Sequence, residues 1–325
     1  MKKFNLFGAL AQLVEQWPFK PFVTGSNPVR PIIILYLLFL TVCVSTTSVH
    51  SSSKNIKITT DDGIILNANL SKNLQNDSVY MIVHGTRGFK TMEIIKSLEE
   101  NIYNKGHDVL SINLSYGFTD RNDNFLSCDI KHTHNEHESV SEIIDWYKYL
   151  LSKNYKKITM VGHSRGGLNI IQAAQKINDN NIELHLLAPI VDTYKGTKDY
   201  YVTEHNLPYE KVIQNNEEFI ISDRYPPINF LFCENAQVSS STFRSYLDFS
   251  ENRNSYPFTF DILKLLTLSN NRVSIYSGTA DEISLDSYKI LESVNNINVT
   301  HHIIDGGDHF FRDIYLDDIV DIMFE

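Results

Sequence analysis

The stretch that most constrains this chain is ITMVGHSRGG, at residues 158–167. An apolar run with β-branched residues stops at Gly162, Ser164 follows two positions later, and residues 168–174 have helical periodicity. This is the G-x-S-x-G pattern in a strand–turn–helix setting. It predicts that Ser164 stands at a sharp turn and presents its hydroxyl as a nucleophile. The alternative is an ordinary strand–helix turn in which the glycines serve packing.

The predicted turn places special demands on the residues around the serine. Ser164 must adopt a strained conformation, which is tolerable where Gly162 and Gly166 lack side chains. Arg165 would begin the following helix, so its backbone N–H should point to the place where an oxyanion would form.

A serine nucleophile needs a base, and the base needs an acid that orients it. Two apolar strand candidates late in the chain, at 273–277 and 299–304, run into loops that contain Asp281 and His309. The C-terminal edge of an open parallel sheet collects such loops. We therefore predict that His309 is the base and Asp281 the orienting acid.

Several other acidic residues could orient His309. Asp281 is preferred to Asp286, Asp305 and Asp308 because it lies in the turn that follows strand 273–277. Asp308 is adjacent to His309, so its side chain should point elsewhere. Glu282 is the nearest competitor.

A second oxyanion donor is expected from the loop that follows the apolar strand at 79–83. There, His84-Gly85-Thr86 matches an H-G-x pattern, and we assign the N–H of Thr86 as the donor, with Gly85 setting the turn. The side chain of Arg165 could meet an acidic group of a substrate. Alternatively, this side chain is solvated or forms a salt bridge within the protein.

Strand and helix patterns alternate along most of the chain. A hairpin is predicted at 56–60 and 64–70 around Asp61-Asp62-Gly63. It is followed by strands at 79–83, 108–114, 158–161, 183–187, 273–277 and 299–304, and by helices at 92–104, 135–151 and 310–324. In the helix at 135–151, Asn135 and Glu138 form a pair that resembles a capping box. The pattern predicts an α/β fold, a mostly parallel sheet with helices on both faces.

The alternation is absent between Pro189 and Arg272. A long aromatic-rich insertion at this place, about 190–272, is predicted to form a helical or loop lid over the strand ends. Its aromatic residues could instead pack the insertion onto the body of the domain.

A cluster of possible metal ligands precedes the helix at 135–151. Cys128, His132, His134 and His137 lie within ten residues, but their spacing matches no standard metal motif. We assign no metal to them and expect no cofactor. In an oxidising compartment, Cys128 could instead pair with Cys233 and tie the lid to the body. Such a bond requires Cα atoms no more than about 7 Å apart.

The N-terminal residues differ from the rest. Residues 8–30 (GALAQLVEQWPFKPFVTGSNPVR) resemble the peptide produced when a tRNA gene is translated in frame, so 1–31 are interpreted as a non-native or disordered extension. Residues 32–44 (IIILYLLFLTVCV) are apolar and suit a signal peptide, or alternatively a membrane anchor, with a linker up to residue 54. The folded domain is therefore predicted at 55–325, in an exported, periplasmic or secreted protein.

The charge of the chain helps to exclude one class of partner. The net charge is −10, and no run is rich in lysine or arginine. This argues against nucleic acid as the main partner.

Four motifs together resemble the α/β-hydrolase superfamily: H-G-x at 84–86, G-x-S-x-G at 162–166, the strand-end Asp281, and the G-x-x-H that ends at His309. The opening DDGIIL at 61–66 is similar to that of the branch with serine aminopeptidases and monoacylglycerol-lipase-like enzymes. The segment with Cys128 and its histidines does not belong to the pattern. The resemblance covers residues from about 55 to the end.

The resemblance implies a serine hydrolase that cleaves a carboxylic ester of a small molecule through an acyl-enzyme. A peptidase, amidase or thioesterase on the same triad is the alternative, and a non-catalytic binding protein of the same fold is a further one. Fold alone does not name the substrate.

Overall fold

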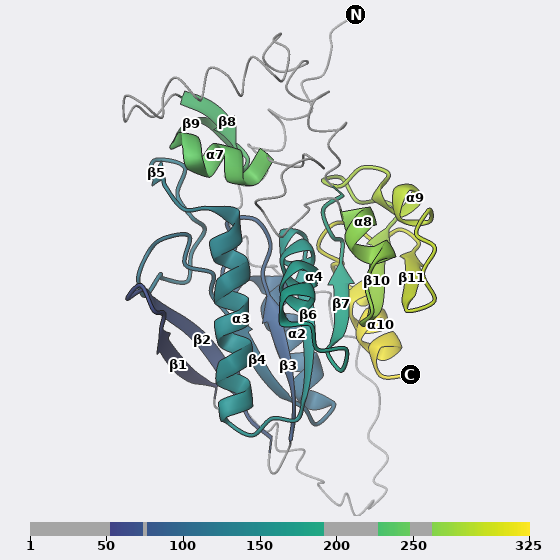
Figure 1. Cartoon of the computed structure of the whole chain (residues 1–325). Coiled ribbons are helices and arrows are strands. Elements are labelled where there is room, and N and C mark those ends of the chain that lie inside the picture. The colour runs from purple at the N-terminus through teal and green to yellow at the C-terminus, as the bar shows by residue number, and fades with distance from the viewer. Residues whose placement is uncertain (1–52, 74–76, 192–226, 248–261) are drawn as a thin grey trace, which may run out of the picture. The chain divides into compact units, whose positions relative to one another are not determined.

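The computed structural model describes residues 53–73, 77–191, 227–247 and 262–325 (Figure 1). The interpretations of 1–31 and 32–44, and much of the predicted lid, lie outside these residues and stay predictions. Within the described ranges, no helix combines the length and the apolar character needed to cross a membrane.

An eight-stranded sheet forms the centre, in the order β1-β2-β4-β3-β6-β7-β10-β11. Its strands are β1 (Lys54–Thr59), β2 (Ile65–Ser71), β3 (Ser78–Val83), β4 (Asp108–Ile112), β6 (Lys157–His163), β7 (Glu183–Leu187), β10 (Arg272–Gly278) and β11 (Val299–Ile304). The strands from β4 to β11 in this order are parallel. The predicted mostly parallel sheet is therefore confirmed.

The antiparallel edge of the sheet is the predicted hairpin. β1 pairs with β2, and β2 pairs antiparallel with β4. Gly63 has a positive φ of 89° in the connecting turn, which glycine adopts without a steric cost.

Helices cover both faces of the sheet. Helices α2 (Glu93–Asn104) and α10 (Ile314–Met323) pack on one face, with buried residues such as Leu98 and Ile319. On the other face pack α3 (Glu136–Ser152), α4 (Arg165–Ile177) and α8 (Ile262–Thr267), and the fully buried Trp146 belongs to this core. A short helix, α9 (Ser287–Leu291), follows β10.

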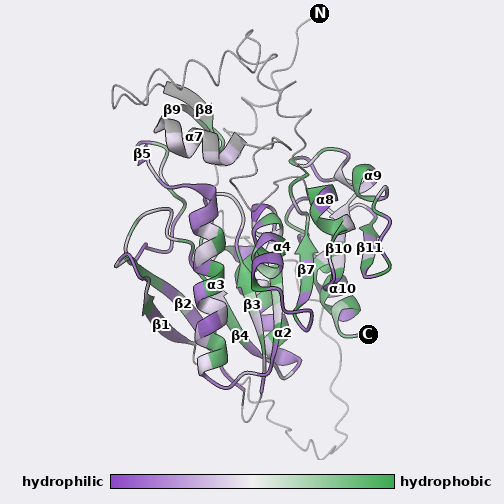
Figure 2. Cartoon of the chain, viewed as in Figure 1, coloured by the Kyte–Doolittle hydropathy of each residue, from purple (hydrophilic) through white to green (hydrophobic). Residues whose placement is uncertain are grey.

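Alternate residues of the central strands supply the two cores. In β3, Val79, Met81 and Val83 belong to one core, whereas Tyr80 and Ile82 belong to the other. Figure 2 shows these strands as mostly hydrophobic, while the helix surfaces carry hydrophilic residues. A strand with both faces covered needs this continuous apolar character.

Two details of the predicted helices were wrong. The closing helix begins at Ile314 rather than near residue 310, because the Asp308 carboxylate accepts the backbone N–H groups of Phe310 and Arg312 and holds them in a turn. At the start of α3, the Asn135 side chain makes no capping bond to the backbone and instead bonds the Glu138 carboxylate at 3.2 Å.

In its described part, the predicted insertion contains two strands, where a helical or loop structure was expected. Strands β8 (Pro227–Phe230) and β9 (Cys233–Val238) form a hairpin, which pairs with β5 (Lys131–His132) in a second sheet, and α7 (Ser240–Leu247) follows. Leu231 and Phe232 both have positive φ in the turn. Such turns normally contain Asn or Gly, so this hairpin has no turn signal. The elements 227–247 are called the hairpin segment below.

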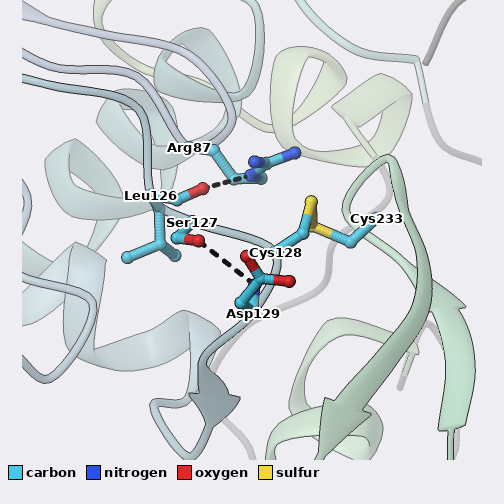
Figure 3. Close-up of a disulfide and its surroundings, with 6 residues drawn as sticks. All are labelled: Arg87, Leu126, Ser127, Cys128, Asp129 and Cys233. Atoms are coloured by element: carbon cyan, nitrogen blue, oxygen red, sulfur yellow. Dashed lines mark hydrogen bonds between the residues drawn. A yellow bond between two sulfur atoms is a disulfide. The ribbon is translucent and has the colours of Figure 1, made fainter. Parts of the chain in front are cut away.

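A disulfide joins the hairpin segment to the body of the domain. Cys128 is bonded to Cys233, with a Cα–Cα distance of 5.3 Å, inside the limit stated above (Figure 3). Beside it, Nε of Arg87 donates to the Leu126 carbonyl at 2.7 Å, so the loop with Cys128 is attached to the loop after β3. The pairing considered for these cysteines is present, and disulfides are typical of oxidising compartments.

Candidate active site

The predicted nucleophile stands at the sharp turn between β6 and α4. Ser164 has φ 56° and ψ −122°, which is an uncommon conformation for a residue with a side chain. Its N–H donates to the Leu187 carbonyl at 2.8 Å, and its carbonyl accepts the N–H of Gly167 at 3.0 Å. These bonds hold the strained residue, which is 6% exposed, at the C-terminal edge of the sheet.

The glycines of the motif are required by close approach of the backbone. A Cβ added to Gly162 would lie 2.4 Å from the Gly166 carbonyl oxygen, and one added to Gly166 would lie 2.4 Å from the Val83 oxygen. The first turn of α4 therefore packs directly on β6 and on the end of β3, which larger residues would prevent.

Asp281 and His309 are brought together from the loops after β10 and β11. His309 Nδ1 lies 2.9 Å from Asp281 Oδ2, and the two residues are 2% and 5% exposed. The backbone N–H groups of Ile283 and Ser284 donate to the other carboxylate oxygen, Oδ1, at 2.9 and 2.7 Å. The carboxylate is thus oriented from both sides.

The surroundings of Asp281 favour its charged form. Burial by itself raises the pKa of this carboxyl, but the His309 hydrogen bond, the His309 charge and the two backbone donors outweigh burial and hold the pKa below its usual value. An ionised carboxylate only accepts, so the proton of this bond lies on Nδ1 of His309. Nε2 is then the ring nitrogen that can act as a base.

The other acidic candidates have different partners. Asp286 bonds Lys289, Asp305 accepts the Thr279 hydroxyl, and Asp308 pairs with Arg312. Glu282 contacts the His309 backbone N–H at 3.3 Å rather than the imidazole.

His163 connects the serine turn to the His309 loop, a role that the sequence analysis missed. Its Nε2 lies 2.8 Å from the His309 carbonyl oxygen, and the two rings have centroids 5.0 Å apart. Burial, followed by the His309 charge, lowers the pKa of His163 to about 3, so the ring is neutral and donates this bond. The variable position of G-x-S-x-G carries no signal for such a contact.

The contact between the predicted nucleophile and base is indirect. Among the described residues, no hydrogen bond joins the Ser164 hydroxyl to the His309 imidazole. Catalytic hydrogen bonds are often long without substrate and tighten when it binds.

The H-G-x loop lies against the serine. A Cβ on Gly85 would be 2.9 Å from the Ser164 Cβ, so only glycine allows this approach. Burial and the nearby Arg121 lower the pKa of His84 to about 3, and the neutral ring accepts the Leu114 N–H at Nε2 (3.1 Å). Nδ1 therefore carries the proton and donates to the Gly85 carbonyl at 2.9 Å. The structure thus places Thr86, the predicted second donor, directly after Gly85, where an added Cβ would meet the Ser164 side chain.

The Arg165 side chain is held by protein groups. Its Nη1 lies 3.3 Å from Oε1 of the fully buried Glu136, and its Nε donates to the Thr86 hydroxyl at 3.3 Å. Of the surroundings considered for the Arg165 side chain, the structure shows the salt bridge, which is formed with Glu136. As the first residue of α4, Arg165 has a backbone N–H in the turn that lacks intrahelical acceptors.

Of the possible metal ligands, His132 and His134 lie near each other, with ring centroids 5.9 Å apart. Cys128 is in the disulfide, and Nε2 of His134 lies 2.9 Å from the Tyr246 hydroxyl. Within residues 53–73, 77–191, 227–247 and 262–325, no group of three His, Cys, Asp or Glu side chains is arranged to hold a metal ion.

Buried neutral histidines make the stability of the fold dependent on pH. Burial lowers the pKa of His84, His134 and His163 to about 3 each, against 6.5 for an ordinary histidine. Between these pH values the unfolded chain binds protons that the folded chain does not. We therefore expect the free energy of unfolding to reach its full value above pH 6.5. As the pH falls below 6.5, it should decrease by about 1.4 kcal/mol per pH unit for each histidine.

Denaturant unfolding at pH 7 and pH 5 measures this loss. His134→Gln keeps a polar group near Tyr246 and should make the pH dependence shallower by one histidine's share. An unchanged slope in the variant would contradict the account of a buried, uncharged His134.

Comparisons with known proteins identify similar structures. No protein-family model and no curated protein sequence matches the chain. Est1E from Butyrivibrio proteoclasticus is similar with a TM-score of 0.58 and 17% identity, over 82% of this chain and 95% of its own. For DcsB, in a complex with its substrate analogue, the values are 0.60 and 15%, over 84% and 97%. An esterase from Pyrococcus furiosus gives 0.54 and 14%, over 92% and 97%.

Proposed function

Because the chain has the α/β-hydrolase fold, we propose that it is a serine hydrolase that cleaves a carboxylic ester of a small molecule. The observation that carries the proposal is the Asp281–His309 bond of 2.9 Å, in a loop that contacts the serine turn through His163. Ser164, His309 and Asp281 are the proposed triad. No cofactor takes part.

The proposed reaction proceeds through an acyl-enzyme. His309 Nε2 removes the proton from Ser164 Oγ as the oxygen attacks the ester carbonyl, and the backbone N–H groups of Thr86 and Arg165 stabilise the resulting oxyanion. The carbonyl re-forms, the bond to the leaving alkoxide breaks, and His309 gives its proton to that alkoxide. Water then repeats the sequence on the acyl-enzyme, which releases the acid and restores the serine.

The choice of an ester is supported by the similar structures. One of them is an esterase, and Est1E has been solved with ferulic acid bound, at 20% identity to this chain and a TM-score of 0.58. These properties belong to those proteins. For this chain they favour a carboxylic ester over an amide or a thioester.

A comparison of matched substrates tests the proposal. We expect the purified protein to hydrolyse p-nitrophenyl esters from acetate to dodecanoate, with one preferred chain length, and to cleave p-nitroanilides of the same acids more slowly. Faster cleavage of aminoacyl p-nitroanilides would identify a peptidase or amidase instead. No turnover of either series, together with no labelling by a fluorophosphonate, would favour a binding protein that shares the fold.

A further inference from the structure

The carbonyl of the Gly85–Thr86 peptide accepts hydrogen bonds from two side chains of the described residues, and the Thr86 hydroxyl accepts one from Arg165. The peptide lies beside the serine, as the 2.9 Å approach of a Gly85 Cβ to Ser164 shows. In a planar trans peptide, the carbonyl of Gly85 and the N–H of Thr86 point in opposite directions. A group that fixes the Gly85 carbonyl therefore also fixes the direction of the Thr86 N–H.

In the described part of the chain, Tyr116 is one of the two side chains that bond this carbonyl. Its hydroxyl donates to the Gly85 oxygen at 3.3 Å, next to the 2.9 Å bond from His84. The same hydroxyl accepts the Arg87 N–H at 3.1 Å, so it joins the residues before and after Thr86. Burial raises the pKa of Tyr116 to about 12, which keeps the phenol protonated and able to donate.

The position of Tyr116 is itself set by its neighbours. The residue is 3% exposed and has a φ of 50°, a backbone conformation that residues other than glycine rarely adopt. The Arg121 guanidinium lies 5.2 Å from the centre of its ring, and the His134 ring packs edge-on against it with centroids 5.0 Å apart. A strained, buried tyrosine with a fixed hydroxyl suits a role in orientation.

The Thr86 side chain is held by Arg165. The 3.3 Å bond from Nε of Arg165 to the Thr86 hydroxyl links the two residues whose backbone N–H groups would bind the oxyanion. Glu136 fixes the guanidinium, and Asn169 donates to the same Glu136 oxygen at 2.9 Å. The Tyr246 ring of the hairpin segment lies 5.2 Å from the guanidinium carbon.

We propose that Tyr116 and the side chain of Arg165 are positioning residues of the oxyanion hole: Tyr116 acts through the Gly85 carbonyl, and Arg165 acts through the Thr86 hydroxyl. This inference rests on the proposed function. Neither side chain touches the substrate in this role. Each sets the distance between the two backbone donors before the oxyanion forms, so each acts on the transition state rather than on substrate binding.

Two conservative variants test the proposal in the full-length protein. Tyr116→Phe removes only the hydroxyl, and Thr86→Val removes the acceptor of the Arg165 bond while it keeps a β-branched side chain. We expect kcat for the best p-nitrophenyl ester to fall about tenfold to 100-fold in each, which is less than the roughly 10²–10³ typical of a lost donor. KM should stay within about twofold, because uniform binding is not affected.

A transition-state analogue separates positioning from stability. An alkyl trifluoromethyl ketone adds to the serine and forms an oxyanion, so its inhibition constant should rise in proportion to the loss in kcat/KM. Tyr147→Phe is the matched control. Tyr147 lies on α3, and its hydroxyl donates to the Asp179 carboxylate at 2.8 Å, so this variant also removes a tyrosine hydroxyl that has a protein partner. This control should lose stability without a change in kcat or in the inhibition constant.

The outcomes distinguish this inference from the proposed function. Wild-type kinetics in Tyr116→Phe, with or without a lower melting temperature, would overturn the role of Tyr116. If that variant does not fold, Thr86→Val decides, and unchanged kinetics there would overturn the proposal. Absence of ester turnover in the unmodified protein would contradict the proposed function itself.

Discussion

Replacement of Ser164 by alanine is expected to lower kcat for an ester substrate by about 10⁶-fold, because triad members act as a unit and the remaining catalysis comes from binding and the oxyanion donors. The fold should tolerate the change. The backbone bonds of residue 164 to Leu187 and Gly167 do not depend on its side chain. The Ser164 hydroxyl makes no hydrogen bond to another described residue, so the substitution removes none. Circular dichroism and thermal unfolding should therefore resemble those of the unmodified protein.

The strained backbone at position 164 supports this expectation further. Serine and alanine both carry a Cβ, so each meets the same restriction at φ 56°. Ser152→Ala is a suitable control, because the hydroxyl of this exposed serine at the end of α3 bonds, among the described residues, the Tyr149 carbonyl. It should leave turnover unchanged. An alanine at 164 that retains more than a hundredth of the activity would assign the nucleophile elsewhere.

The second large effect is expected for Asp281→Asn, in which kcat should fall by about 10⁴-fold. The reason lies in the two backbone donors at Oδ1. The N–H groups of Ile283 and Ser284 require an acceptor there, so the amide oxygen of an asparagine takes that place. Its NH₂ group then faces His309 Nδ1 and donates to it. The imidazole proton moves to Nε2, and the nitrogen that should accept the serine proton is no longer a base.

Glu282→Gln is the matched control for this variant. Glu282 is adjacent to Asp281 and contacts the same loop, but through the His309 backbone N–H at 3.3 Å. An amide oxygen can still accept that bond, so turnover should change little. A larger loss in Glu282→Gln than in Asp281→Asn would assign the orienting acid to Glu282, the competitor that the sequence left open.

Most of the central sheet could be predicted from the sequence because each strand carries its own signal. β7 and β11 match the predicted ranges 183–187 and 299–304, and the apolar run of β6 was visible before the serine. Parallel strands covered on both faces are continuously apolar, which makes them easy to recognise. Since their C-terminal ends share one edge, the approach of Asp281 to His309 followed from the order of the elements.

The hairpin segment could not be predicted for physical reasons. β5 has two residues, too few for a periodic pattern, and it pairs with β9, a strand about 100 residues later. The turn at Leu231 and Phe232 uses positive φ values that these residues rarely adopt. Only the two cysteines indicated the contact, and the sequence alone could not exclude that they served other roles.

Several residues that support the site carry no local signal. His163 and Tyr116 act through backbone carbonyls of residues 146 and 31 positions away, at 2.8 and 3.3 Å. No spacing rule predicts such contacts, because they depend on how the loops meet above the sheet. Glu136 was likewise visible only as part of a helix start, whereas the structure buries it against Arg165 and Asn169.

The most direct test of the account is to identify the residue that a fluorophosphonate modifies. The protein is treated with the probe, digested, and the adduct is located by mass spectrometry. We expect one phosphonylated residue, Ser164, with loss of ester turnover in proportion to labelling and no adduct in Ser164→Ala. An adduct on another residue that accompanies the loss of activity, or full activity with Ser164 modified, would contradict it.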